Sequence, residues 1–316
     1  MKLNPLFLLA LLPCTLISQD YQAIDAFARS VSFSKDYPGI AKELAAPYST
    51  QEEQTRAIFT WIAHNIRYDD RQAARPQEDE AVEYRSQAEL EQARQARLQE
   101  KLDRMLRKKK GVCQDYAWLF QAMLAEVGIE SEFIGGYSRT SPEQMGRVPR
   151  QPMHAWNAVK IDGKWQLFDL TWSTDMEETG SNGFFMMPPE QFLRSHYPSE
   201  DKWQLLDSLV TLEDWSGRAY WHKSYHRYPI TRLMVDGQAH EHYEVPYEGE
   251  LSLTAELKPG QKLYAMNASG NKRVELVQSG QQYTVQLKEH RLRGTITIVA
   301  VEGNRFSPVL SFKVRS

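Results

Sequence analysis

The feature that most constrains the fold of this chain is a change in hydrophobic pattern at about Tyr228. Beyond that point apolar residues alternate with polar ones in short runs, and glycine-containing turns separate the runs. Short strands at this spacing predict a β-sandwich of immunoglobulin-like type over residues 228–316. The alternating sets are Leu251/Leu253, Tyr283/Val285/Leu287, Ile296/Ile298/Ala300 and Leu310/Phe312/Val314, and the turns are Pro259-Gly260, Ser269-Gly270, Ser279-Gly280 and Gly303-Asn304.

Residues 19–227 combine helical and strand patterns and are predicted to form one α+β domain. Helical spacing predicts helices over 19–46, after residue 50 and over 116–127. The second helix begins at a capping box, formed either by Ser49 with Glu52 or by Thr50 with Glu53. Strands are expected around 131–137, 155–161 and 165–170, and a tight Asp162-Gly163 turn joins the last two into a hairpin.

A long charged insertion interrupts this domain at residues 71–110. Arg, Gln, Glu, Lys and Ala dominate it and apolar residues are sparse, which predicts a solvated, salt-bridged helix. The basic run at residues 107–110, just before Gly111, is typical of a helix C-terminus, where positive side chains interact favourably with the helix dipole. The sequence leaves open whether the insertion folds over a cleft or projects into solvent.

The first 18 residues have the pattern of an export signal, with Lys2 as a positive start, an apolar stretch at residues 6–12 and polar chain from Ser18. We therefore expect an exported protein, whether periplasmic, cell-surface or secreted. The apolar stretch is too short to span a bilayer, so no stable membrane span is expected. Cys14 could suggest lipid attachment, but residues 11–13 lack the small side chain that lipoprotein processing needs. A buried N-terminal helix is the alternative.

Removal of that segment would leave Cys113 as the only thiol, because the sequence contains 2 cysteines. Structural cysteines of exported proteins normally occur in pairs, so a lone thiol indicates either a function or a buried, unreactive side chain. The formal net charge of −3 gives no overall field that would attract a nucleic-acid backbone. Nucleic acid is therefore not an expected partner.

Cys113 lies just ahead of a predicted helix, where the free N–H groups and the helix dipole favour the thiolate. A thiol nucleophile needs an imidazole to move the proton and a third group to orient the ring. His154 begins one strand of the predicted hairpin and Asp169 lies on the other. Pairing centred on the Asp162-Gly163 turn places both at one end of the hairpin. Cys113, His154 and Asp169 are therefore the predicted catalytic residues, against the alternative of three residues kept for packing.

These residues lie in three segments that together resemble the core of the transglutaminase-like superfamily, namely residues 111–117, 153–159 and 162–172. Segments 60–69 and 184–206 resemble its kyphoscoliosis-peptidase and cytokinesis-protein branch, so the resemblance covers about residues 50–210. It implies a papain-like cysteine-enzyme core with Cys113, His154 and Asp169 as the triad. No cofactor is expected, and no metal either, because no HExxH-type pattern is present. The signature of papain itself is absent, and the 71–110 insertion departs from the usual pattern.

The resemblance implies acyl transfer through a thioester on Cys113. Water as the acceptor gives amide or peptide hydrolysis, whereas an amine gives protein transamidation. Hydrolysis is the first expectation, because nothing in the sequence visibly selects a lysine acceptor. The substrate is expected to be a protein or peptide, with cell-wall peptide as one option. The alternative is a catalytically inactive domain that serves in binding, adhesion or assembly at the cell surface.

Overall fold

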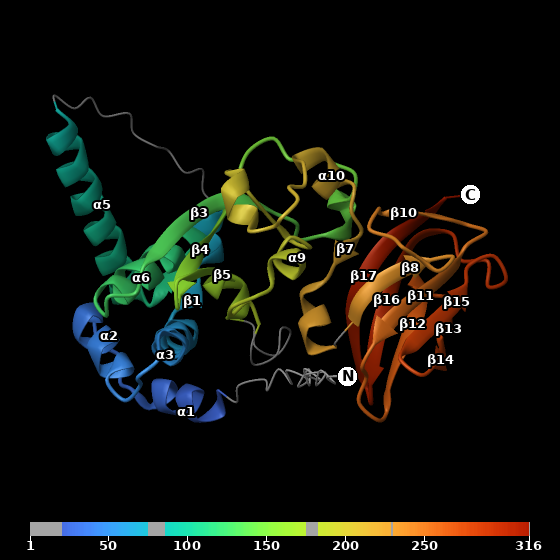
Figure 1. Cartoon of the computed structure of the whole chain (residues 1–316), viewed down its shortest axis with the longest axis horizontal. Helices are drawn as coiled ribbons and strands as arrows, with labels where there is room; N and C mark the ends of the chain where they lie inside the picture. Colours follow the sequence, from blue (N-terminus) through green and yellow to red (C-terminus); the bar gives the residue numbers. More distant parts are fainter. Residues whose placement is uncertain (1–20, 75–85, 175–182, 229, 316) are drawn as a thin grey trace, which may run out of the picture.

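The computed structural model describes residues 21–74, 86–174, 183–228 and 230–315 (Figure 1). Helices α1 to α3, α5 and α6 and the sheet containing β3 to β5 occupy one end of the molecule, and strands β8 to β17 occupy the other, with α9, α10 and β7 between them. The predicted export signal lies outside the described residues. Within the described ranges no helix is both long and apolar enough to cross a membrane.

The N-terminal region folds as two helices, α1 (Gln22–Ser30) and α2 (Tyr37–Ala45), so the prediction of one helix over 19–46 is wrong. The break has a local cause. Asp36 is the N-cap of α2 and accepts the Gly39 N–H at 3.2 Å, and Pro38 lies in the first turn, where its missing N–H costs nothing.

Helix α3 (Gln51–Asn65) begins in a capping box, and the structure selects one of the two predicted pairs. The Glu53 N–H donates to Thr50 Oγ1 at 3.2 Å, and the Thr50 N–H donates to Glu53 Oε2 at 3.4 Å. The first turn of α3 is therefore set by Thr50 with Glu53.

A buried ion pair joins α1 to α3. Arg56 donates through Nε and Nη2 to the two carboxylate oxygens of Asp25, each at 2.7 Å, and Thr60 Oγ1 donates to Oδ1 at 2.6 Å. Arg56 is 1% exposed and Asp25 is 5% exposed. The bidentate geometry offsets the desolvation of both charges and fixes the angle between the helices.

Replacing Asp25 with alanine should lower the free energy of unfolding by about 3–5 kcal/mol, because the substitution leaves the charge of Arg56 buried without its carboxylate. Urea denaturation followed by circular dichroism would measure the loss. The matched control is the double variant Asp25→Leu/Arg56→Met, which removes both charges and should lie closer to the native protein. A loss below about 1 kcal/mol for Asp25→Ala would contradict the structural role of the pair.

A four-stranded antiparallel sheet of order β5-β4-β3-β6 packs against α6 (Cys113–Ala125) through β3 and β4. The β4–β5 hairpin has the predicted register, with Asn157 opposite Phe168 and Ile161 opposite Lys164 around the Asp162-Gly163 turn. Gly163 has φ of +79°, which glycine adopts without strain. The strands are β3 (Ser131–Ser138), β4 (His154–Ile161), β5 (Lys164–Phe168) and β6 (His196–Pro198).

Two predicted boundaries change near the site. Helix α6 starts at Cys113, three residues before the predicted start at 116. Strand β5 ends at Phe168, so Asp169 is not a strand residue but the N-cap of α7 (Leu170–Ser173). Its Oδ1 accepts the Trp172 N–H at 3.0 Å, which is the competing local hydrogen bond that ends the strand.

The described part of the insertion contains α4 (Asp70–Ala73) and α5 (Gln87–Lys108). Helix α5 buries Leu102, Met105 and Leu106 near its C-terminal end, and Figure 1 shows the rest projecting away from the body of the molecule. Of the two options that the sequence left open, α5 therefore projects into solvent. Arg104 near its end forms an ion pair with Asp115 of α6 at 3.9 Å.

The C-terminal residues form two sheets, of order β10-β17-β16-β12-β13 with β7 on β17, and β14-β15-β11-β8-β9. Residues from both sheets share one hydrophobic cluster, and the alternating sets predicted from the sequence are buried in it. Each of the four predicted turns contains a glycine with positive φ. The domain boundary at residue 228 stays a prediction.

The remaining elements are short connections and the strands of these sheets. The helices are η1 (Pro142–Gln144), α9 (Pro189–Phe192), η2 (Asp201–Gln204), α10 (Leu212–Ser216) and η3 (Lys223–Arg227). The strands are β1 (Arg67–Tyr68), β2 (Lys110–Gly111), β7 (Tyr220–Trp221), β8 (Ile230–Val235), β9 (Gln238–Ala239), β10 (Glu244–Pro246), β11 (Glu250–Ala255), β12 (Gln261–Asn267), β13 (Arg273–Glu275), β14 (Val277–Ser279), β15 (Gln282–Gln286), β16 (Gly294–Glu302) and β17 (Arg305–Arg315).

Candidate active site

Cys113 is the first residue of α6 and is 9% exposed, packed with Ala117, Ala155 and Phe133. The start of the helix is held by Asp115, whose Oδ2 accepts the Val112 N–H at 3.0 Å. The first N–H groups of a helix have no acceptor within the helix, so the Cys113 N–H is available to a developing oxyanion. This position gives the thiol both a helix N-terminus and a hydrogen-bond donor for its reaction partner.

His154 and Asp169 meet at the end of the β4–β5 hairpin. His154 Nε2 lies 2.7 Å from Asp169 Oδ2, and the two side chains are buried. The predicted proximity of these two residues is thus found without any slip in register.

The electrostatics link the imidazole to both neighbours. Burial lowers the pKa of His154, but the charge and hydrogen bond of Asp169, together with a hydrogen bond and charge interaction with Cys113, outweigh it and raise that pKa to about 9. Burial also raises the pKa of Asp169, and the interactions with His154 and His196 overcome it and hold the pKa well below its usual range. Because His154 Nε2 is hydrogen-bonded to Asp169, Nδ1 is the ring nitrogen of His154 that can interact with Cys113.

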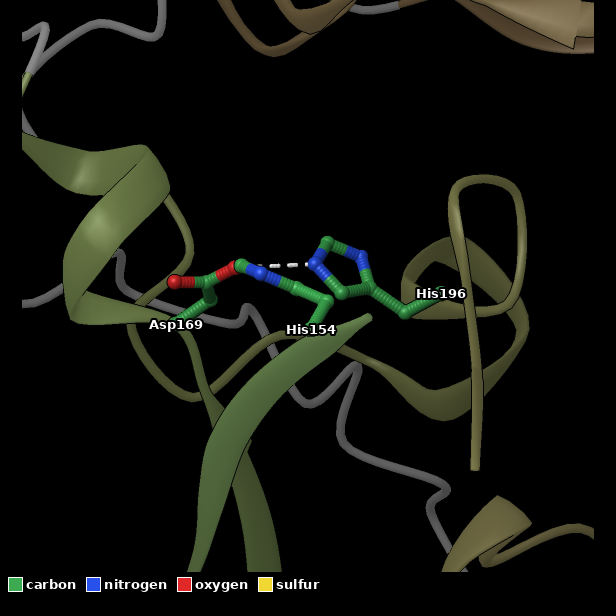
Figure 2. Close-up of side chains that lie close together, drawn as sticks. All are labelled: His154, Asp169 and His196. Atoms are coloured by element: carbon green, nitrogen blue, oxygen red, sulfur yellow. Dashed lines mark hydrogen bonds and ion pairs between the residues drawn. The ribbon is translucent and has the colours of Figure 1, made fainter. Parts of the chain in front are cut away.

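A second histidine, which the sequence did not assign to the site, bonds the same carboxylate oxygen. His196 begins β6, and its Nε2 lies 2.8 Å from Asp169 Oδ2. Figure 2 shows the rings of His154 and His196 approaching Asp169 from separate strands. The Ser195 hydroxyl lies 2.8 Å from His196 Nδ1. Burial lowers the pKa of His196 to about 4, although Asp169 acts in the opposite direction.

These contacts give the two histidines different roles. The neutral His196 ring donates Nε2–H to Asp169 and accepts the Ser195 hydroxyl at Nδ1, a tautomer assigned from its hydrogen bonds. Both ring nitrogens of His196 are thus engaged, and the side chain is fully buried. His154 keeps Nδ1 for the thiol. The arrangement therefore allows His154, but not His196, to exchange a proton with the thiol.

His196 could hardly be predicted from the sequence, because its proximity to the site comes from sheet order. Strand β6 pairs with β3, which separates it from β4, and Gly136 of β3 stands opposite both His154 and Pro198. A Cβ at Gly136 would lie 2.3 Å from the Trp156 ring, so only glycine lets that ring cross β3 toward His196. The available signal was that His196 falls in the downstream segment 184–206 of the resemblance.

The ligand atoms of His154, Asp169 and His196 lie within 4.8 Å of one another, the one group among the described residues that has the composition and spacing for a metal ion. Two ligands of a tetrahedral zinc ion at its usual bond lengths lie about 3.3 Å apart. The separations of 2.7 and 2.8 Å are instead those of hydrogen bonds, and one oxygen serves both rings. We therefore interpret the group as a hydrogen-bonded network.

Comparison with known proteins matches part of this chain to a family. The profile of the transglutaminase-like superfamily matches residues 38–170, a range that contains Cys113, His154 and Asp169. The chain carries a transglutaminase-like domain. The matched range ends one residue after Asp169, so His196 lies beyond it.

Relatives extend the similarity past that range. The chain is 29% identical over 222 residues to "Kyphoscoliosis peptidase" of Homo sapiens and 30% identical over 220 residues to that of Mus musculus, covering 65% of this chain in each case. It spans 30% and 29% of the length of those proteins. A solved structure described as a TGase aligns with 50% of this chain and 35% of that one, at 17% identity and a TM-score of 0.28. These are likenesses over part of each chain.

The surface around the candidate triad of the transglutaminase-like domain carries two exposed apolar side chains. Met153, next to His154, is 80% exposed, and Tyr68, whose strand pairs with the one that leads to Cys113, is 37% exposed. Trp172 borders the imidazole from inside, with its ring centroid 5.7 Å from that of His154. A peptide chain approaching the thiol would therefore meet apolar surface near both Cys113 and His154.

Proposed function

We propose that this protein is a transglutaminase-like cysteine enzyme that cleaves an amide or peptide bond through a thioester on Cys113. The observation that carries the proposal is the continuous connection of thiol, imidazole and carboxylate, with His154 linked both to Cys113 and to Asp169. The alternative of a catalytically inactive binding module has no comparable observation in its favour.

In the proposed reaction His154 takes the proton of the Cys113 thiol, and the thiolate attacks the carbonyl carbon of the substrate. The Cys113 N–H stabilises the oxyanion, and the imidazolium returns its proton to the departing amine as the C–N bond breaks. Water, deprotonated by neutral His154, then attacks the thioester and releases the acid and the thiol. A pKa of about 9 for His154 favours the thiolate–imidazolium pair at neutral pH.

Hydrolysis is proposed over transamidation because water needs no further site, whereas a lysine acceptor needs one. The name of the mammalian relatives, a peptidase, supports the same choice. We also propose export, on the pattern of the first 18 residues, and an immunoglobulin-like type for the C-terminal sheets, on their alternation and turns.

Trapping the thioester tests the proposal directly. The protein would be incubated with a peptide library, quenched in acid and digested, and the mass of the peptide containing Cys113 measured. We expect an acyl adduct on Cys113 that hydroxylamine removes and that prior treatment with iodoacetamide prevents. The proposal would be contradicted if acyl adducts formed only on other residues. It would also be contradicted if no library member acylated Cys113 although the Cys113 thiol was shown to be free.

A further inference from the structure

A pocket of about 460 Å³ lies beside the candidate triad, between the ends of α1 and α3, strand β1 and the residue that follows α7. Two of its walls adjoin the reacting residues. Tyr68 pairs with Gly111, two residues before Cys113, and Thr174 directly follows the helix that Asp169 caps. The pocket is therefore placed to receive a part of the substrate close to the attacked carbonyl.

The pKa of Tyr68 indicates that this side of the pocket lies close to Cys113. Burial raises the pKa of Tyr68 to about 12, and the charges of Cys113, Asp70 and Asp169 add to the rise. Charge interactions of this kind fall off steeply with distance and solvent screening. Tyr68 thus lines the pocket and lies close enough to Cys113 to feel its charge.

The pocket lining is basic. Arg29 from α1, Arg67 from β1 and His64 from the last turn of α3 all line it, and among the described residues its lining contains no Asp or Glu. All three basic side chains are exposed, and in the described parts of the chain neither arginine has an ion pair with a carboxylate. Two full positive charges therefore face the pocket with their hydrogen-bond donors available.

Negative charge also lies near the pocket. Asp25, which bonds Thr60 of the lining, is already paired with Arg56 in bidentate geometry. The C-terminus of α3 contributes about half a negative charge, and Asp70 follows two residues after Tyr68. Against these, Arg29 and Arg67 line the pocket from separate elements, α1 and β1.

We propose that this pocket binds the carboxylate of an acidic side chain, Asp or Glu, in the peptide or protein whose acyl group Cys113 attacks. Arg29 and Arg67 would donate hydrogen bonds to its two oxygens, and Tyr68 would pack against its methylene groups. The inference rests on the proposed function and adds to it a substrate class, acidic peptides. The inference predicts that the pocket prefers a charged side chain, such as Glu, over its neutral isostere, such as Gln.

The test compares peptide pairs that differ only by Glu against Gln at each position beside the susceptible amide. For the position that contacts the pocket, we expect kcat/KM of the native protein to favour Glu by about 10-fold or more, and the preference to fall as salt is added. The double variant Arg29→Gln/Arg67→Gln should reduce the ratio to about 1, through a fall in kcat/KM for the Glu peptide. Arg94→Gln, on the projecting part of α5, is the matched control and should keep the preference.

A binding measurement separates this inference from the proposed function. Fluorescence anisotropy of the same labelled peptides with Cys113→Ala protein needs no turnover. Tighter binding of the Glu peptide that disappears in the double arginine variant would support the pocket even if no peptide were cleaved. Equal binding and equal kcat/KM for every Glu and Gln pair, or a preference that the double variant retains, would overturn the inference while leaving an acyl-enzyme on Cys113 intact.

Discussion

Replacing Cys113 with alanine should abolish turnover, a loss of about 10⁵-fold or more in kcat for a peptide substrate. The substitution removes the sulfur atom that forms the proposed covalent intermediate. His154 and Asp169 would remain in place, because their mutual hydrogen bond at 2.7 Å does not depend on the thiol. The rate of amide cleavage, followed by mass spectrometry of the products, measures the loss.

The fold should tolerate this change, which makes the result interpretable. Cys113 contacts small apolar neighbours at the first position of α6, where alanine is an excellent helix former. Melting temperature should therefore stay close to that of the native protein. The variant Cys113→Ser is the matched control: its hydroxyl preserves the shape but is a poorer nucleophile without a stronger base, so it should also be inactive. Full activity in either variant would remove Cys113 from the mechanism.

The parts of the fold that could be predicted are those whose cause is local. Thr50 and Glu53, three positions apart, form the hydrogen bonds that start a helix, and the Asp162-Gly163 turn fixes the register of a hairpin. The same hairpin brings His154 to Asp169. The break between α1 and α2 also had a local sign, Pro38 after Asp36, but helical periodicity on both sides obscured it.

The parts that could not be predicted depend on the order of strands in space. His196 reaches Asp169 only because β6 adds to the free edge of β3, 27 residues after Asp169 in the chain. No spacing rule connects a three-residue strand to a distant carboxylate. The basic pocket likewise combines residues from α1, α3 and β1 that lie apart in sequence, so its charge could not be recognised as a cluster before folding.

Replacing Asp169 with asparagine should lower kcat/KM by about 10²- to 10⁴-fold. The substitution keeps the shape and an acceptor for Trp172 but removes the negative charge that raises the pKa of His154. Burial of the imidazole remains, so the pKa of His154 should fall below 9 and the imidazolium should be lost at lower pH. At pH 7 the thiolate would then lose its charged partner.

The rate of iodoacetamide reaction with Cys113, measured against pH, reports this loss. In the native protein the rate should already be high near pH 7, whereas the Asp169→Asn protein should react slowly there. Above about pH 9.5 the two rates should converge, because hydroxide then removes the thiol proton without help from the imidazole. Profiles that coincide at every pH would show that Asp169 has only a structural role.

Variants of His196 test whether the activity lost on changing Asp169 depends on the orientation of its carboxylate or only on its presence. If His196 positions the carboxylate, His196→Gln, which can still donate an N–H to Asp169 Oδ2, should retain more activity than His196→Ala, which cannot. The two variants should also differ in the pH profile of Cys113 alkylation, since a misplaced carboxylate raises the pKa of His154 less. Equal activities and equal profiles would instead mean that His196 only fills space beside Trp172 and Phe192. We therefore predict that thiolate formation depends on the orientation of the Asp169 carboxylate and not on its presence alone.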